Sequence, residues 1–158
     1  MDAVAITGIA VAVVAAVASL AGVVLKNRHD RGRQREQDRL ARQKELRDVL
    51  DRGGDALTAA LYAFDRRRVA PPEERRATGE DFNDKVEEVE VMAARITERI
   101  GKDETATQSY RGALGSLKEL RTLVYKAGEG LSPEESEQAD HLRERVVSLR
   151  SEYEHARP

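Results

Sequence analysis

An uncharged apolar segment at the amino terminus constrains this chain more than any other feature. Residues 3–25 form a run of 23 residues without a single Asp, Glu, Lys or Arg. As an α-helix, this run is about 34 Å long, which is enough to cross a hydrocarbon core of about 30 Å. Because lipid offers no hydrogen-bonding partner to the backbone, a run of this length is expected to be helical. The sequence therefore predicts a transmembrane anchor at residues 1–25.

Two other interpretations of the run remain. A cleaved signal peptide has a basic start and a short apolar region that ends in small residues. Ala16-Val17-Ala18 would serve as the cleavage site, but the only charge before the run is Asp2. The other interpretation is a buried helix of a soluble protein. We favour the uncleaved span, because the basic residues follow the run instead of preceding it.

The charge is distributed unevenly along the chain. Residues 26–42 hold seven Lys or Arg against three Asp or Glu, whereas residues 43–158 hold 20 against 25. By the positive-inside rule, this asymmetry predicts a single-pass protein of the cell membrane with its amino terminus outside and its bulk in the cytoplasm. Residues 26–45 are either a helical stalk or a helix that lies on anionic lipid, with Gly32 as a bend. The predicted lipid contacts are Lys26, Arg28, Arg31, Arg33 and Arg35.

Small residues recur at four-residue spacing inside the predicted span. Gly8, Ala12 and Ala16 would share one face of the helix. Small residues let two transmembrane backbones approach closely, so this face is a candidate for self-association or for contact with another membrane protein. The alternative is that a GC-rich genome uses Ala at any apolar position.

Residues 46–158 carry apolar side chains at the three- and four-residue spacing of amphipathic helices. Short loops join the last three helical segments, which makes neighbouring helices antiparallel. We therefore expect an all-α fold: the anchor, a basic juxtamembrane helix at 26–45, and an antiparallel helical bundle or set of coiled-coil hairpins at 46–158. The four apolar stripes are Leu46, Leu50, Leu57, Leu61 and Phe64; Phe82, Val86, Val89, Ala93, Ile96 and Ile100; Ala106, Tyr110, Ala113, Leu117, Leu120 and Val124; and Ala139, Leu142, Val146, Leu149 and Tyr153.

Two local signals bear on where these helices begin and end. Gly53 and Gly54 interrupt the first stripe, so they either permit a close helix crossing or split the element, with Asp55 capping a new helix. Ser132, followed by Pro133 and by Glu135 three residues on, predicts a capping box at the start of the last helix.

The sequence holds no recognisable catalytic constellation. It contains no cysteine and three histidines, and only Glu152 with His155 matches a Glu-x-x-His pattern, of which a di-iron site needs two. We therefore predict a non-enzymatic protein without cofactor or metal. The acidic residues Glu87, Glu88 and Glu90 are expected on a solvated helix face.

One basic cluster lies away from the predicted membrane segment. Residues 66–68 are three consecutive arginines, and Arg75 and Arg76 follow shortly after. Cations are favourable near a helix C-terminus, so a solvated helix end is the expected role. Direct binding of nucleic acid is not expected, because it would need a wider basic surface and stacking aromatics, and residues 43–158 as a whole are net acidic.

The layout resembles that of small single-span proteins of GC-rich actinomycete bacteria. An Ala/Val-rich span is followed by Arg/Asp/Glu-rich helices such as Arg47-Asp48-Val49-Leu50-Asp51-Arg52. In length and layout the chain is similar to the KilB-type spread proteins of streptomycete conjugative plasmids. This resemblance implies a membrane-anchored accessory in plasmid transfer and mycelial spread, and it assigns no functional residue. The alternative is a chromosomal envelope or cell-division regulator that acts through helix–helix contacts.

Overall fold

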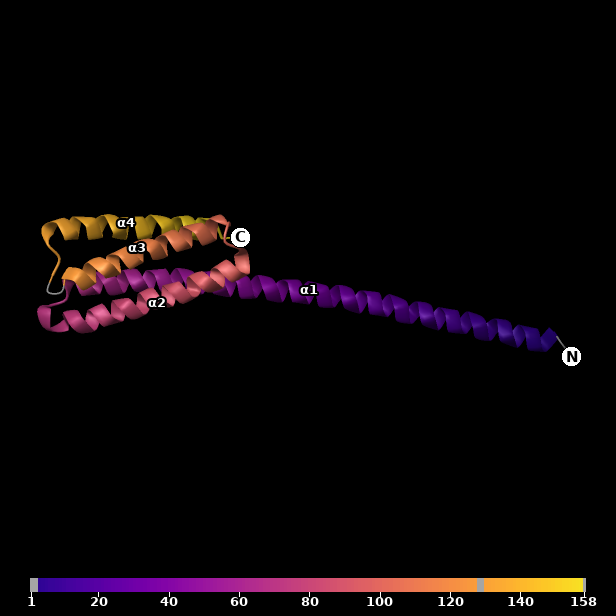
Figure 1. The fold of residues 1–158 in the computed structure, drawn as a ribbon. Helices are drawn as coiled ribbons and strands as arrows, with labels where there is room; N and C mark the ends of the chain where they lie inside the picture. Colours follow the sequence, from indigo (N-terminus) through magenta and orange to yellow (C-terminus); the bar gives the residue numbers. More distant parts are fainter. Residues whose placement is uncertain (1–2, 128–129, 158) are drawn as a thin grey trace. The chain divides into compact units, whose positions relative to one another are not determined.

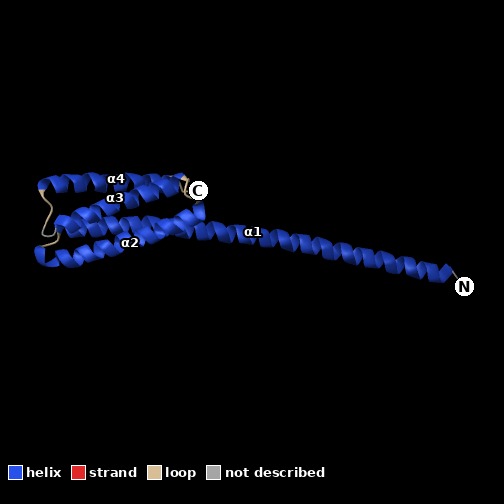
Figure 2. Cartoon of the chain, in the orientation of Figure 1, coloured by secondary structure: helices blue, strands red, loops and turns tan. Residues whose placement is uncertain are grey.

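Each apolar stripe lies on an α-helix in the structure, a computed structural model that describes the backbone of residues 3–127 and 130–157 (Figure 1). Side chains are described for residues 26, 31–127 and 130–157. The elements are α1 (Ala3–Val69), the 3₁₀ turn η1 (Pro72–Glu74), α2 (Arg75–Ile100), α3 (Thr105–Ala127) and α4 (Pro133–His155). Within the described part of the chain no strand occurs (Figure 2). The predicted all-α class is confirmed.

The chain divides into two units, Met1–Glu45 and Leu46–Pro158. In the first unit, Lys26 and residues 31–45 are exposed. The predicted span falls on residues whose side chains lie outside the described part. Among the residues that are described, no helix is both long and apolar enough to cross a membrane. The anchor therefore stays a prediction.

The second unit is a helical bundle, as predicted. Residues 46–69 of α1 lie side by side with α2, α3 and α4, and successive helices run in opposite directions (Figure 1). The apolar stripes meet in one core, whose fully buried members include Leu57, Val89, Leu117 and Val146. Burying such stripes supplies most of the stability of helices like these, because isolated helices are marginal in water.

The helix boundaries follow from local chemistry. Val69 ends α1 two residues before Pro71, which disfavours the helical conformation in the residue that precedes it. Gly101 ends α2 at a positive φ of 112°, and its amide donates to the Thr97 carbonyl at 3.0 Å. The 3₁₀ turn η1 leads directly into α2. Pro72 is tolerated there because a first helical turn needs no amide donor.

The predicted capping box at α4 is confirmed. The Glu135 amide donates to Ser132 Oγ at 3.3 Å, and the Ser132 amide donates to Glu135 Oε2 at 2.8 Å. The bond from the Ser132 amide holds the pKa of the Glu135 carboxyl below its usual value, because it favours the ionised form.

Gly53 lies where α1 packs closely against side chains of the core. A Cβ atom built there would lie 2.7 Å from Tyr153 Oη, 2.8 Å from Ile96 Cδ1 and 3.1 Å from Tyr110 Cε2. Side chains from α4, α2 and α3 therefore occupy the space that any residue larger than glycine would need. Because α1 continues unbroken through this position, the close-crossing interpretation is confirmed, and a new helix capped by Asp55 is wrong.

Two tyrosines pack beside this crossing. The rings of Tyr110 and Tyr153 meet edge to face with their centroids 5.0 Å apart, and both are fully buried. Tyr153 Oη donates to the Leu50 carbonyl at 2.6 Å, and the Arg157 guanidinium lies 4.9 Å from the centre of the Tyr153 ring. Burial raises the pKa of Tyr153 to about 12, since the phenolate would lose its hydration. The hydroxyl therefore stays a donor and ties α4 to α1.

Candidate functional site

The predicted membrane contacts are only partly described. The candidate self-association face, Gly8, Ala12 and Ala16, lies outside the described side chains, as does Arg28. The remaining predicted lipid contacts are exposed: Lys26, Arg31, Arg33 and Arg35. Both interpretations of residues 26–45, a helix that lies on anionic lipid and a helical stalk, require exposed side chains, so this exposure does not discriminate between them.

The two residues of the Glu-x-x-His pair on α4 make separate hydrogen-bonding contacts, one to α3 and one within α4. Glu152 accepts a hydrogen bond from Ser109 Oγ at 3.3 Å, and His155 Nδ1 lies 2.7 Å from the Ser151 carbonyl. In the part of the chain that the structure describes, no group of three His, Asp or Glu side chains is placed to hold a metal ion.

An open groove of about 750 Å³ runs between α1 and α2. Its apolar lining consists of Ala56 and Ala59 from α1 and of Val91 and Met92 from α2. Ala56 and Met92 belong to the core, whereas the Val91 residue is 53% exposed. The alanines make the groove possible, because longer side chains at these positions of α1 would fill it.

Charged residues line the edges of this groove, with an excess of carboxylates. The acidic residues are Asp55, Asp84, Glu87 and Glu88, and the basic ones are Arg52 and Arg95. Glu87 and Glu88 are exposed, as the sequence predicts, although Glu88 accepts a hydrogen bond from Lys85 at 2.7 Å. The groove therefore combines an apolar floor with a net negative rim. We call this surface the α1–α2 groove.

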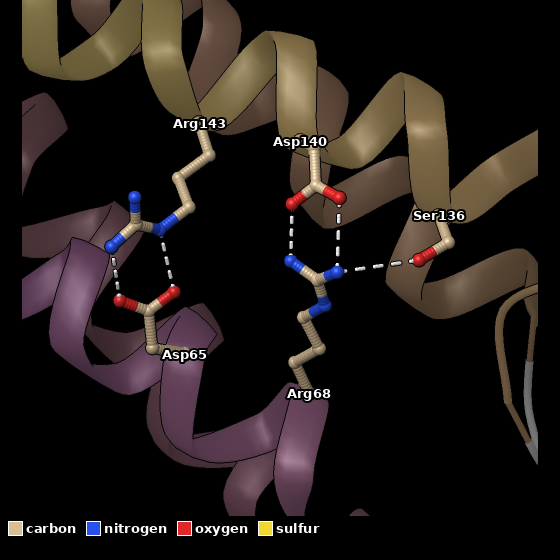
Figure 3. A network of polar contacts seen from close by, with 5 residues as sticks. All are labelled: Asp65, Arg68, Ser136, Asp140 and Arg143. Atoms are coloured by element: carbon tan, nitrogen blue, oxygen red, sulfur yellow. Dashed lines mark hydrogen bonds and ion pairs between the residues drawn. The ribbon is translucent and has the colours of Figure 1, made fainter.

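The opposite side of α1 is tied to α4 by ion pairs (Figure 3). Arg143 Nε and Nη2 donate to the two oxygens of Asp65, each at 2.7 Å. Arg68 forms a similar two-bond pair with Asp140, and its Nη2 lies 3.4 Å from Ser136 Oγ. Partly exposed pairs of this kind contribute about 0–1 kcal/mol each. These pairs join α4 to residues of α1 that do not line the groove.

The three consecutive arginines at the end of α1 have three different environments. Arg66 is exposed, Arg67 is buried and Arg68 pairs with Asp140. The expectation of a solvated helix end is therefore wrong for Arg67. Burial lowers the pKa of Arg67 below its usual value, and the positive charge of Arg75 lowers it further. A signal was present in the sequence, since Arg67 follows Phe64 at the three-residue spacing of the first stripe.

Comparisons with protein-family models, with curated proteins and with solved structures give no match. The chemistry and geometry of the surfaces described above are therefore the basis for inferring a function.

Proposed function

We propose that this chain is a non-enzymatic, membrane-anchored interaction protein whose α1–α2 groove receives a helix of a partner. The observation that carries the proposal is the groove itself, with its apolar floor and its four carboxylates against two guanidinium groups. An amphipathic helix is recognised by laying its apolar face into such a groove. The charge at the rim favours a helix whose apolar stripe is flanked by Lys or Arg.

The rim contributes more to selection than to affinity. Opposite charges steer a basic helix toward the groove, and acidic helices are repelled. The apolar floor supplies the area that is removed from water, which is the main favourable term in association. Val91 is the natural anchor point, because about half of its surface is still available to a partner.

Membrane anchoring would assist this contact. Two proteins that are confined to one membrane meet at a raised effective concentration, so a weak groove contact becomes sufficient. The partner is either a second copy of the chain, held through Gly8, Ala12 and Ala16, or another membrane protein with a basic amphipathic helix.

The layout shared with KilB-type proteins supports plasmid transfer and mycelial spread as the process that this contact serves. The alternative process is envelope regulation or cell division, which would use the same groove with another partner. Neighbouring genes discriminate between the two: plasmid transfer and repressor genes favour spread, and division or cell-wall genes favour the alternative.

A photo-cross-linking residue at position 91 should capture the partner in native membranes, and the same residue at position 147 should not. Val147 is a matched control, because it is also exposed and apolar but lies on α4, away from the groove. Ala59→Glu should reduce capture by about tenfold, since it fills the groove and adds a repulsive charge. A product of twice the mass of the chain would identify a second copy. Equal capture from positions 91 and 147 would refute the groove.

Deleting residues 1–25 should move the protein from the membrane pellet into the soluble fraction, because the run supplies the apolar length that spans lipid. The measurement is fractionation after carbonate extraction, with the full-length chain as control. A full-length chain that carbonate releases would show that there is no anchor.

A further inference from the structure

Two contacts show how α1 and α2 are aligned along the α1–α2 groove. The rings of Phe64 and Phe82 have their centroids 5.6 Å apart. A Cβ atom built at Gly53 would lie 2.8 Å from Ile96 Cδ1. The contact with the earlier residue of α1 therefore involves the later residue of α2, so the two helices run antiparallel along the groove.

This alignment separates the charges of the rim. Arg52 of α1 and Arg95 of α2 each immediately precede a residue of the second contact, so both lie near one end of the groove, which we call the arginine end. The other charged residues that α2 contributes come seven to eleven positions before Arg95, which is about 10–16 Å along the helix. They are Asp84, Glu87 and Glu88, and we call this part of the groove the acidic end.

Other charges reduce this separation without removing it. Asp55 of α1 lies one turn into the groove from the arginine end. Lys85 donates to Glu88 at 2.7 Å, and Arg121 of α3 shares a second, smaller pocket with Glu87. Neither of these two cations is among the described residues that line the groove itself. The lining is therefore net positive at the arginine end and net negative at the acidic end.

The behaviour of Lys85 supports a negative potential at the acidic end. The pKa of its ammonium group is raised above the usual value, first by the hydrogen bond to Glu88 and further by the charges of Asp81 and Asp84. A neighbouring negative charge has this effect because it favours the protonated amine. The carboxylates of α2 therefore outweigh the other charges that act on Lys85.

The middle of the groove is apolar. Val91 of α2 lies four positions before Arg95 and three positions after Glu88, and Ala59 lines the groove from α1. A helix laid on this floor would reach both ends, because about 16 Å corresponds to three helical turns. One part of the bound helix would then lie beside arginines and another part beside carboxylates.

We propose that the α1–α2 groove selects a partner helix whose charges are segregated, with Lys or Arg in one half and Asp or Glu in the other. The basic half lies over the acidic end, and the acidic half lies beside Arg52 and Arg95. Like charges at either end would be repelled, which excludes helices with the wrong order. This inference rests on the proposed function and specifies the partner that the groove receives.

The side chains, and not the helix dipole, set the direction of the bound helix. The dipole is equivalent to about half a charge at each end of a helix, whereas each ionised side chain carries a full charge. Because α2 runs from the acidic end to the arginine end, a partner helix with its basic half first lies parallel to α2. A partner with its acidic half first lies parallel to α1.

The test uses the full-length protein in a non-ionic detergent and two synthetic peptides of about 18 residues, long enough to reach both ends of the groove. Both peptides have the same composition and the same leucine stripe, and a hydrocarbon staple keeps both helical. In the segregated peptide all Lys precede all Glu, and in the other peptide they alternate. Fluorescence anisotropy of the labelled peptides gives the two dissociation constants.

The segregated peptide should bind about tenfold more tightly at low ionic strength, since several exposed ion pairs each add a few-fold. The difference should shrink toward 1 M salt, where charges are screened within about 3 Å. Ala59→Leu should weaken the binding of both peptides, because it fills the groove without changing its charge. Unchanged binding in Ala59→Leu would show that the peptides bind elsewhere and would overturn the proposal.

A double variant tests the arginine end directly. Arg52→Glu with Arg95→Glu makes both ends acidic, so the preference for the segregated peptide should disappear. Both arginines are exposed, so the fold should tolerate the change. Arg111→Glu with Arg145→Glu is the matched control, because it changes the net charge equally at exposed positions of α3 and α4, and neither residue lines the groove. This control should keep the preference.

The outcomes separate this inference from the proposed function. Equal binding of the two peptides to the wild type at low ionic strength would overturn the charge order but leave the groove as a helix-binding site. No binding of either peptide up to about 1 mM would overturn the proposed function and this inference with it. Loss of the preference in the control variant as well would also overturn the charge order, because the effect would then be one of net charge.

Discussion

Replacing Ile96 with aspartate should abolish the cooperative thermal unfolding of the bundle. Ile96 is fully buried, and its Cδ1 would lie 2.8 Å from a Cβ atom built at Gly53. A carboxylate there would have no hydrogen-bonding partner and would have to be protonated or drive local unfolding. Changes of this kind cost more than about 4 kcal/mol, which approaches the total of about 5–15 kcal/mol that stabilises a typical domain.

The measurement is a melting curve followed by near-ultraviolet circular dichroism, because the packed rings of Tyr110 and Tyr153 report on the bundle and not on the exposed residues 31–45. Val147→Asp is the control, since Val147 is 45% exposed and can keep an aspartate hydrated. A wild-type transition in Ile96→Asp would mean that the core lies on another face of α2.

Two glycine-to-alanine changes should have opposite effects on stability. Gly53→Ala should lower the free energy of unfolding by about 1–3 kcal/mol, because its new methyl group would overlap Tyr153 Oη and Ile96 Cδ1. Gly115→Ala should raise it by up to about 1 kcal/mol, since alanine is the better helix former. Gly115 lies on α3 with no atom within 4 Å of the new methyl position.

Chemical denaturation of the full-length protein in detergent measures both changes with the same probe. Helix propensity alone would predict a higher free energy of unfolding for both variants. A lower free energy of unfolding for Gly53→Ala would therefore isolate the effect of packing. A stabilised Gly53→Ala variant would show that the Tyr153 ring can move aside without losing its hydrogen bond to the Leu50 carbonyl.

The helical bundle could be predicted from the sequence because the patterns that indicate a helix involve residues close together in the chain. Stripe residues recur within one or two turns, and the signals that end or begin a helix, such as Gly101 and Ser132, act through bonds to residues at most four positions away. Such patterns can be recognised without knowing which helix packs against which. The anchor at residues 1–25 is an inference of the same local kind, and it awaits the fractionation experiment.

The way in which the helices pack together depends on contacts between residues far apart in the chain. Arg68 meets Asp140 across 72 residues, and Gly53 meets Tyr153 across 100. Periodicity shows which face of a helix is apolar, but it does not show which neighbour covers that face.

The sequence alone was therefore sufficient to predict the all-α class, the four apolar stripes and the capping box, and to identify the uncharged run, since each depends on neighbouring residues. Only the tertiary structure decided that Gly53 marks a close crossing, that Arg67 is buried beside Arg75, and that Ala59 and Val91 line one groove. The physical reason is that burial and like-charge proximity are properties of packed helices, and the packing arises only when distant segments meet.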